Sequence, residues 1–81
     1  KTHHPKLVRM DVYARQIVGD RVRKTREYLC ISKVDFCLAA DISRPFLDQI
    51  ESGRANPSLE TLCNVAGALG MTVSDLLEGV S

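Results

Sequence analysis

The sequence predicts an all-α fold, a compact bundle of five short helices in one domain. Three observations support this prediction. Apolar residues recur at helical spacing, Ser and Thr caps with Gly and Pro divide the chain into five helical segments and no strand, and the connections between segments are short. The 81 residues, 44% of them apolar, suffice for one modest core. Because so short a chain is only marginally stable alone, pairing with a second subunit would help it.

The first helix is predicted from about Asp11 or Tyr13 to Leu29. Its apolar stripe consists of residues at helical spacing, namely Ile17, Val18, Val22, Thr25 and Leu29. Charged residues, most of them basic, fall mainly on the other side. Gly19 lies inside the pattern, where it either weakens the helix or marks its true start.

The second helix is predicted to begin after Ser32 and to end near Ala40. Ser32 as N-cap and Asp35 three residues later resemble a capping box, although that box prefers Glu or Gln at the later position. The residues expected to pack are Val34, Phe36, Cys37 and Ala40. Only "ADI" separates this helix from the next, so the two must meet at a steep angle.

The third helix is predicted within "ISRPFLDQIESG". Ser43 is a good N-cap, Pro45 occupies the first turn where its missing amide has no helical partner, and Gly53 stops the helix. One side carries Phe46, Leu47 and Ile50. The other side carries polar residues and the proline: Arg44, Pro45, Asp48, Gln49 and Ser52.

Two further helices complete the bundle. After the loop "RANPS", the fourth begins around Asn56–Ser58, with Pro57 in its first turn and Gly70 at its end. Its expected core stripe is Leu59, Leu62, Cys63, Ala66 and Leu69. The fifth is "TVSDLLEG", with Thr72 as N-cap and Gly79 past its end.

Four segments in this order resemble a known family. "VGDRVRKTRE" and "ISKVDFCLA" are similar to its first two helices, "DISRPFLDQIESGRANPSLETL" to its recognition helix and the loop that follows, and "AGALGMTVSDLLEG" to its closing pair. Residues 18–79 thus resemble the phage repressor and Cro type of helix-turn-helix domain, found in bacterial XRE-type regulators. The resemblance implies a lambda-repressor-like fold with its helix-turn-helix over about residues 32–52. We expect a flexible N-terminal arm at residues 1–10 and the DNA-binding domain at 11–81.

The sequence departs from this family at several positions. Cys30 and Asp41 stand where turns usually hold glycine, so either the turns change shape or the domain is less stable than its relatives. Cys37 replaces the usual alanine at the contact of the second and third helices, and Lys33 replaces a common glutamine.

A recognition helix reads duplex DNA by placing its N-terminal residues against base edges in the major groove. The expected base-contacting residues are Arg44, Pro45, Asp48 and Gln49. Arg44 can pair with guanine O6 and N7, and Gln49 with adenine. Pro45 offers only apolar contact, as to a thymine methyl. Asp48 either accepts from a cytosine amine or repels phosphate. The alternative for Arg44 is a solvated surface arginine.

Phosphate contacts need helix N-terminal amides and short polar or basic side chains. The resemblance places six residues along the DNA backbone: Arg26, Ser32, Lys33, Ser43, Arg54 and Asn56. The two serines can alternatively serve as caps alone. A similar run at Arg21, Arg23 and Lys24 is either a phosphate-binding or merely a solvated face.

The resemblance also implies a partly buried salt bridge between Arg26 and Glu51, which would fix the recognition helix. Charge is uneven along the chain although the net charge is only +1. Residues 1–40 hold nine Lys/Arg and four Asp/Glu, whereas residues 41–81 hold two and six. This asymmetry predicts one basic and one acidic surface, unless the charges simply line solvated helix faces.

The composition favours no enzyme, metal site or cofactor. Both histidines lie in the expected arm, and no nucleophile–base set, carboxylate pair or phosphate-binding glycine loop is evident. Cys30, Cys37 and Cys63 are widely spaced and odd in number, which favours reduced thiols in an intracellular protein. Cys30 follows several basic residues, so a redox-sensing role is a weaker alternative. No membrane-spanning run or signal peptide is visible.

The leading functional prediction is a bacterial or phage transcriptional regulator in the cytoplasm, associated with the nucleoid. It should bind a near-palindromic operator as a homodimer. Four apolar residues near the C-terminus are candidates for dimerisation, or else close the core of the monomer: Val73, Leu76, Leu77 and Val80. The alternative is a protein-interaction module, such as an antitoxin that holds a toxin with the same fold. An attached C-terminal domain is another possible protein partner.

Overall fold

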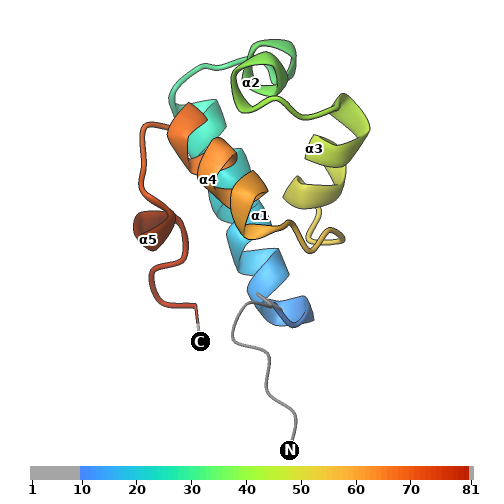
Figure 1. Cartoon of the computed structure of the whole chain (residues 1–81), viewed down its shortest axis with the longest axis vertical. Coiled ribbons are helices and arrows are strands. Elements are labelled where there is room, and N and C mark those ends of the chain that lie inside the picture. The colour runs from blue at the N-terminus through green and yellow to red at the C-terminus, as the bar shows by residue number, and fades with distance from the viewer. Residues whose placement is uncertain (1–9, 81) are drawn as a thin grey trace, which may run out of the picture.

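The computed structural model describes residues 10–80, which form five helices around one core (Figure 1). These helices are α1 (Val12–Tyr28), α2 (Lys33–Ala40), α3 (Arg44–Glu51), α4 (Leu59–Ala68) and α5 (Val73–Leu76). Within residues 10–80 there is no strand, so the predicted all-α fold is confirmed. Apart from Met10, the predicted arm lies outside the described residues.

Each helix begins at a side chain that accepts a hydrogen bond from a backbone amide of the first turn. The capping residues are Asp11, Ser32, Ser43, Ser58 and Thr72. Thr72 and Asp75 form both hydrogen bonds of a capping box. Pro57, expected in the first turn of α4, instead precedes the cap, because Ser58 rather than Asn56 satisfies the first amides.

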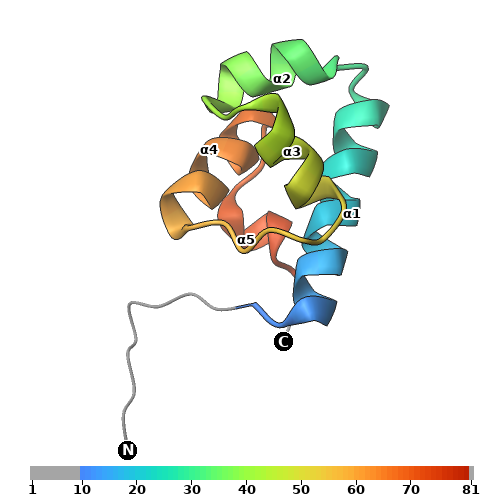
Figure 2. The same cartoon turned by 90° about the vertical axis from the view of Figure 1, so that its right-hand side faces the viewer.

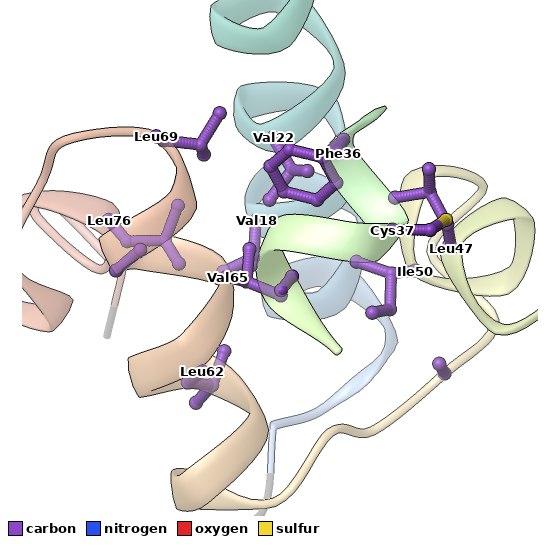
Figure 3. Packing of buried hydrophobic residues seen from close by; sticks show 13 residues of the cluster. Val18, Val22, Phe36, Cys37, Leu47, Ile50, Leu62, Val65, Leu69 and Leu76 are labelled. Atoms are coloured by element: carbon purple, nitrogen blue, oxygen red, sulfur yellow. The ribbon is translucent and has the colours of Figure 1, made fainter. Parts of the chain in front are cut away.

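The core lies between α1, α2, α3 and α4, where α3 packs against α1, and α2 packs against α3 and α4 (Figure 3). Phe36 of α2, Leu47 of α3 and Val22 of α1 are fully buried in the same cluster. The other large buried side chains are Val18, Leu62, Val65 and Leu76. The short connection between α2 and α3 turns the chain sharply, as predicted, so that α3 runs across α1 (Figure 2).

Four residues predicted for the core lie exposed instead: Leu29, Val34, Leu59 and Cys63. Leu29 follows the end of α1, and Leu59 is the first residue of α4, so both extend past the layer beneath them. Along α4 the buried positions are 62, 65, 66 and 69, a stripe that includes Val65 and leaves Cys63 outside. The predicted helical period is correct, but the buried stripe of α4 lies slightly further around the helix than predicted.

Gly19 lies well inside α1, so it does not mark the start of the helix. At Gly19 the backbone of α1 approaches that of α3 closely. A Cβ atom at this position would lie 2.1 Å from the backbone oxygen of Ile50, which is too close for any side chain. Gly19 therefore permits the close backbone contact between α1 and the end of α3.

The two turns that lack the family's glycine keep a left-handed backbone. Cys30 and Asp41 both have a φ of 58°, and Asp41 forms the C-cap of α2. This conformation costs an ordinary L-residue about 1–2 kcal/mol, with Asp tolerated better than most. Both turns therefore keep the left-handed shape, and the cost of placing an L-residue in it lowers the stability of the domain.

Candidate nucleic-acid interface

Helix α3 has one buried face and one exposed face. Leu47 and Ile50 are 0% and 2% exposed in the core, whereas the opposite face presents four residues to solvent: Arg44, Pro45, Asp48 and Gln49. Phe46 is partly buried against the core. The predicted division into a packing side and an exposed side is thus present in the structure, and contact of the exposed residues with bases stays a prediction. Pro45 lies in the first turn, where it interrupts no helical hydrogen bond.

The C-terminal end of α3 is fixed to α1 by the expected ion pair. Arg26 Nε lies 2.7 Å from Glu51 Oε2, and Arg26 Nη2 lies 3.3 Å from Glu51 Oε1. The two side chains are only 8% and 6% exposed. Arg26 Nη1 also donates to the carbonyl oxygen of Ile31 at 3.0 Å, so one guanidinium joins α1, the turn before α2, and α3. The hydrogen bonds that Arg26 donates to the Glu51 carboxylate raise the pKa of Arg26.

This burial separates the two roles predicted for Arg26. Its three guanidinium nitrogens all donate to protein acceptors, and little of the side chain reaches solvent. The ion pair is confirmed, and the phosphate contact stays a prediction.

The N-termini of α2 and α3 are capped by serines that are exposed to solvent. Ser32 Oγ accepts from the Asp35 amide at 3.0 Å, and Ser43 Oγ accepts from the Phe46 amide at 3.2 Å. Both serines cap their helices while they remain exposed to solvent. Capping by the hydroxyl leaves other first-turn amides free of helical partners, which is the arrangement that binds anions.

An ion pair that the sequence analysis missed joins α2 to α3 on this surface. Lys33 Nζ lies 2.9 Å from Asp48 Oδ1, and the side chains are 39% and 48% exposed. The hydrogen bond from Lys33 lowers the pKa of Asp48, and the Arg44 charge lowers it further. No signal in the sequence pairs two residues that lie 15 positions apart on different helices.

The loop after α3 carries the other two predicted phosphate contacts. Arg54 Nε donates to Ser52 Oγ at 3.0 Å, and Ser52 is the C-cap of α3. Asn56 Oδ1 accepts from the Met10 amide at 3.5 Å, which ties the loop to the start of α1. Both residues are exposed. Their proximity to the end of α3 is compatible with the predicted roles but does not test them.

The basic residues Arg21, Arg23 and Lys24 of α1 bind mainly to other groups of the protein. Arg21 Nη1 donates to the carbonyl oxygens of Leu76 and Glu78 at 3.0 and 2.7 Å, which caps the end of α5. Lys24 Nζ lies 3.0 Å from Asp20 Oδ2, and Arg23 also pairs with Asp20. Because α5 and α3 pack on different sides of α1, Arg21 lies away from the exposed face of α3 (Figure 1).

The predicted dimerisation residues divide into two groups. Leu76 is 0% exposed, so it closes the monomer's core and is wrong as a dimer contact. Val73, Leu77 and Val80 are partly buried and pack against the core. They keep some surface for a partner.

Other kinds of site find little support. No three side chains that could ligate a metal gather among residues 10–80. Over the same residues, none of the helices combines the length and the apolar character needed to cross a bilayer. Cys30 and Cys63 are exposed free thiols and Cys37 is a buried one, whose pKa burial raises.

Residues 22–76, from the middle of α1 to the end of α5, match the helix-turn-helix family. The chain belongs to this family. An HTH-type transcriptional regulator of Deinococcus deserti, DdrOP3, is 49% identical over 61 residues, which are 75% of this chain and 47% of that protein. The immunity repressor protein of Bacillus phage phi105 is 43% identical over 60 residues, 74% of this chain and 42% of that protein. The chain therefore spans less than half the length of these two relatives.

Solved structures of helix-turn-helix proteins share the arrangement. The DNA-binding domain of the P22 C2 repressor superimposes with a TM-score of 0.75 at 28% identity, covering 79% of this chain and 84% of that one. The family resemblance inferred from the segments is thus confirmed.

Proposed function

We propose that this helix-turn-helix chain binds double-stranded DNA sequence-specifically, as the DNA-binding domain of a transcriptional regulator. The observation that carries the proposal is the exposed face of α3, which presents Arg44 and Gln49 on a helix seated by Leu47, Ile50 and a buried ion pair. The regulator and repressor names of its relatives support the same role. The role is one of binding and needs no catalysis.

In this proposal, the exposed face of α3 enters the major groove. Arg44 can donate two hydrogen bonds to guanine O6 and N7, and Gln49 can pair with adenine N6 and N7. Pro45 meets the edge of a base with carbon only and also stiffens the turn that carries Arg44. Asp48 can accept from an exocyclic amine.

Phosphate contacts would come from the rim of this surface. The amides at the N-termini of α2 and α3, next to Ser32 and Ser43, favour anions. Lys33, Arg54 and Asn56 add side-chain donors on either side of α3. These contacts would position α3 without reading sequence.

We further propose that residues 11–81 form the binding domain and act in the cytoplasm as a homodimer. The partly exposed Val73, Leu77 and Val80 near the C-terminus are the candidate contact. A two-fold dimer would place two copies of α3 about one helical turn of DNA apart, so the site should be near-palindromic.

Selection of bound sites from a random duplex pool tests the proposal. The expected result is an enriched, near-palindromic sequence whose binding weakens steeply with salt, because phosphate contacts release counterions. Failure to bind any duplex at low salt would contradict the proposal and favour a protein-interaction role instead. Enrichment of an asymmetric single site would contradict the homodimer.

A further inference from the structure

The Lys33–Asp48 ion pair occupies the proposed DNA-binding surface. Lys33 is the first residue of α2, and Asp48 lies one helical turn after Arg44 on the exposed face of α3. Their 2.9 Å contact spans the two helices of the motif. A duplex that reaches Arg44 and Gln49 must therefore also meet this pair.

A carboxylate is unfavourable on a surface that receives phosphates. Asp48 repels the DNA backbone, and its contact with Lys33 offsets a positive charge that could otherwise bind a phosphate. The pair thus weakens the part of DNA binding that depends on charge alone. This part supplies nearly all of the affinity for non-specific DNA.

Lys33 and Asp48 can each exchange the other for a partner on the DNA. Both side chains are more than a third exposed, and exposed ion pairs add little to stability. Lys33 is flexible and has three donors, so it can turn to a phosphate. The released carboxylate then needs a new donor, which the exocyclic amine of cytosine or adenine supplies in the major groove.

We propose that the Lys33–Asp48 pair is a selectivity device, which opens fully only on a site that offers a base amine opposite Asp48. On other sequences, Lys33 must either stay paired or leave a carboxylate without a partner beside the DNA. The device penalises non-specific binding more than specific binding. This inference depends on the proposed function, since it assigns a role within the same surface.

Asp48→Asn tests the device, because it keeps the shape of the side chain and removes its charge. Affinity is measured against salt for the selected duplex and for a scrambled duplex of equal composition. On the scrambled duplex, we expect binding to tighten about fivefold to tenfold at 0.1 M salt, and the log–log salt slope to steepen by about 0.9, as for one added phosphate contact. The ratio of specific to non-specific affinity should fall.

Two matched variants isolate the exchange from the change in net charge. Glu78→Gln makes the same charge change beyond α5, on the other side of α1, and should leave the slope unchanged (Figure 1). In a Lys33→Gln background, Asp48→Asn should no longer steepen the slope. Thermal midpoints of all variants show whether each one folds.

Three results would overturn the inference: equal effects of Asp48→Asn and Glu78→Gln, equal steepening with and without Lys33, or an unchanged selectivity ratio. If the parent protein binds neither duplex, the proposed function itself fails. If the parent binds the selected duplex and Asp48→Asn only matches Glu78→Gln, the proposed function stands and the device alone is rejected.

Discussion

Glu51→Ala should destabilise the domain strongly and weaken DNA binding mainly for that reason. The substitution removes both Glu51 oxygens that accept from the buried Arg26 guanidinium, at 2.7 and 3.3 Å. It leaves the Ile31 carbonyl as a hydrogen-bond acceptor and the Glu27 carboxylate 3.9 Å from Arg26 Nη2. The two side chains are 8% and 6% exposed, so water cannot readily replace the carboxylate. A buried arginine would therefore remain between α1 and α3, with only the more distant and exposed Glu27 as counter-charge.

Removing one partner of a buried ion pair costs about 3–5 kcal/mol. At about 0.05–0.15 kcal/mol per residue, a domain of this size has only about 4–12 kcal/mol of stability in total. Each kcal/mol corresponds to about 4–8 °C in a domain of 60–100 residues, so the thermal midpoint should fall by about 12–40 °C. A parent at the lower end of this range would leave a large fraction of the variant unfolded near physiological temperature.

Thermal unfolding followed by circular dichroism measures the effect, with exposed Glu78→Ala as the matched control. The double variant Arg26→Met/Glu51→Leu should recover much of the lost stability, because apolar side chains of similar volume can replace a buried ion pair. Equal midpoints for Glu51→Ala and the parent would refute the reasoning. So would a double variant that loses at least as much as Glu51→Ala alone.

Three other predictions follow from the packing and the backbone. Cys30→Gly and Asp41→Gly should each stabilise the domain by about 0.5–1 kcal/mol in urea unfolding, because glycine relieves left-handed strain but costs chain entropy; a loss of stability in both would contradict the strain. Gly19→Ala should cost about 1–3 kcal/mol or more, because its methyl group would collide with the backbone of α3, and an unchanged midpoint would argue against the close helix contact. With a thiol reagent at neutral pH, mass spectrometry should show rapid labelling of Cys30 and Cys63 but slow labelling of Cys37, since burial both shields that thiol and raises its pKa; equal rates at all three would contradict this packing.

Local chemistry explains why the helices could be predicted from the sequence. A cap such as Ser32, Ser43 or Thr72 acts within three residues, so its effect can be recognised without knowing the fold. The exact core face of each helix could not be predicted in the same way. Whether Val65 or Cys63 points inwards depends on how α4 crosses its neighbours, and a rotation of the stripe by part of a turn leaves the periodicity unchanged.

The candidate site likewise combines features that the sequence predicts with a feature that only the packing of the helices reveals. The exposed face of α3 follows from its own amphipathic pattern, and the Arg26–Glu51 pair was expected from the family resemblance. The contact of Lys33 with Asp48 depends on the crossing of two helices, so the sequence alone could not reveal it. Leu76 was misassigned as a possible dimer contact because apolar residues near a chain end can face either a partner or their own core.

The most direct test of the central claim is the effect of Arg44→Ala on affinity for the selected duplex, with Lys24→Ala as the control. Both variants lose one positive charge. Lys24, however, pairs with Asp20 on α1 and lies one turn from Arg21, the residue whose side chain caps α5. If α3 reads the major groove, Arg44→Ala should weaken binding to the selected duplex by about 1–3 kcal/mol and relax preference at one base position, while Lys24→Ala has little effect on preference. Equal losses in the two variants, with base preference unchanged, would contradict the claim that this face of α3 recognises sequence.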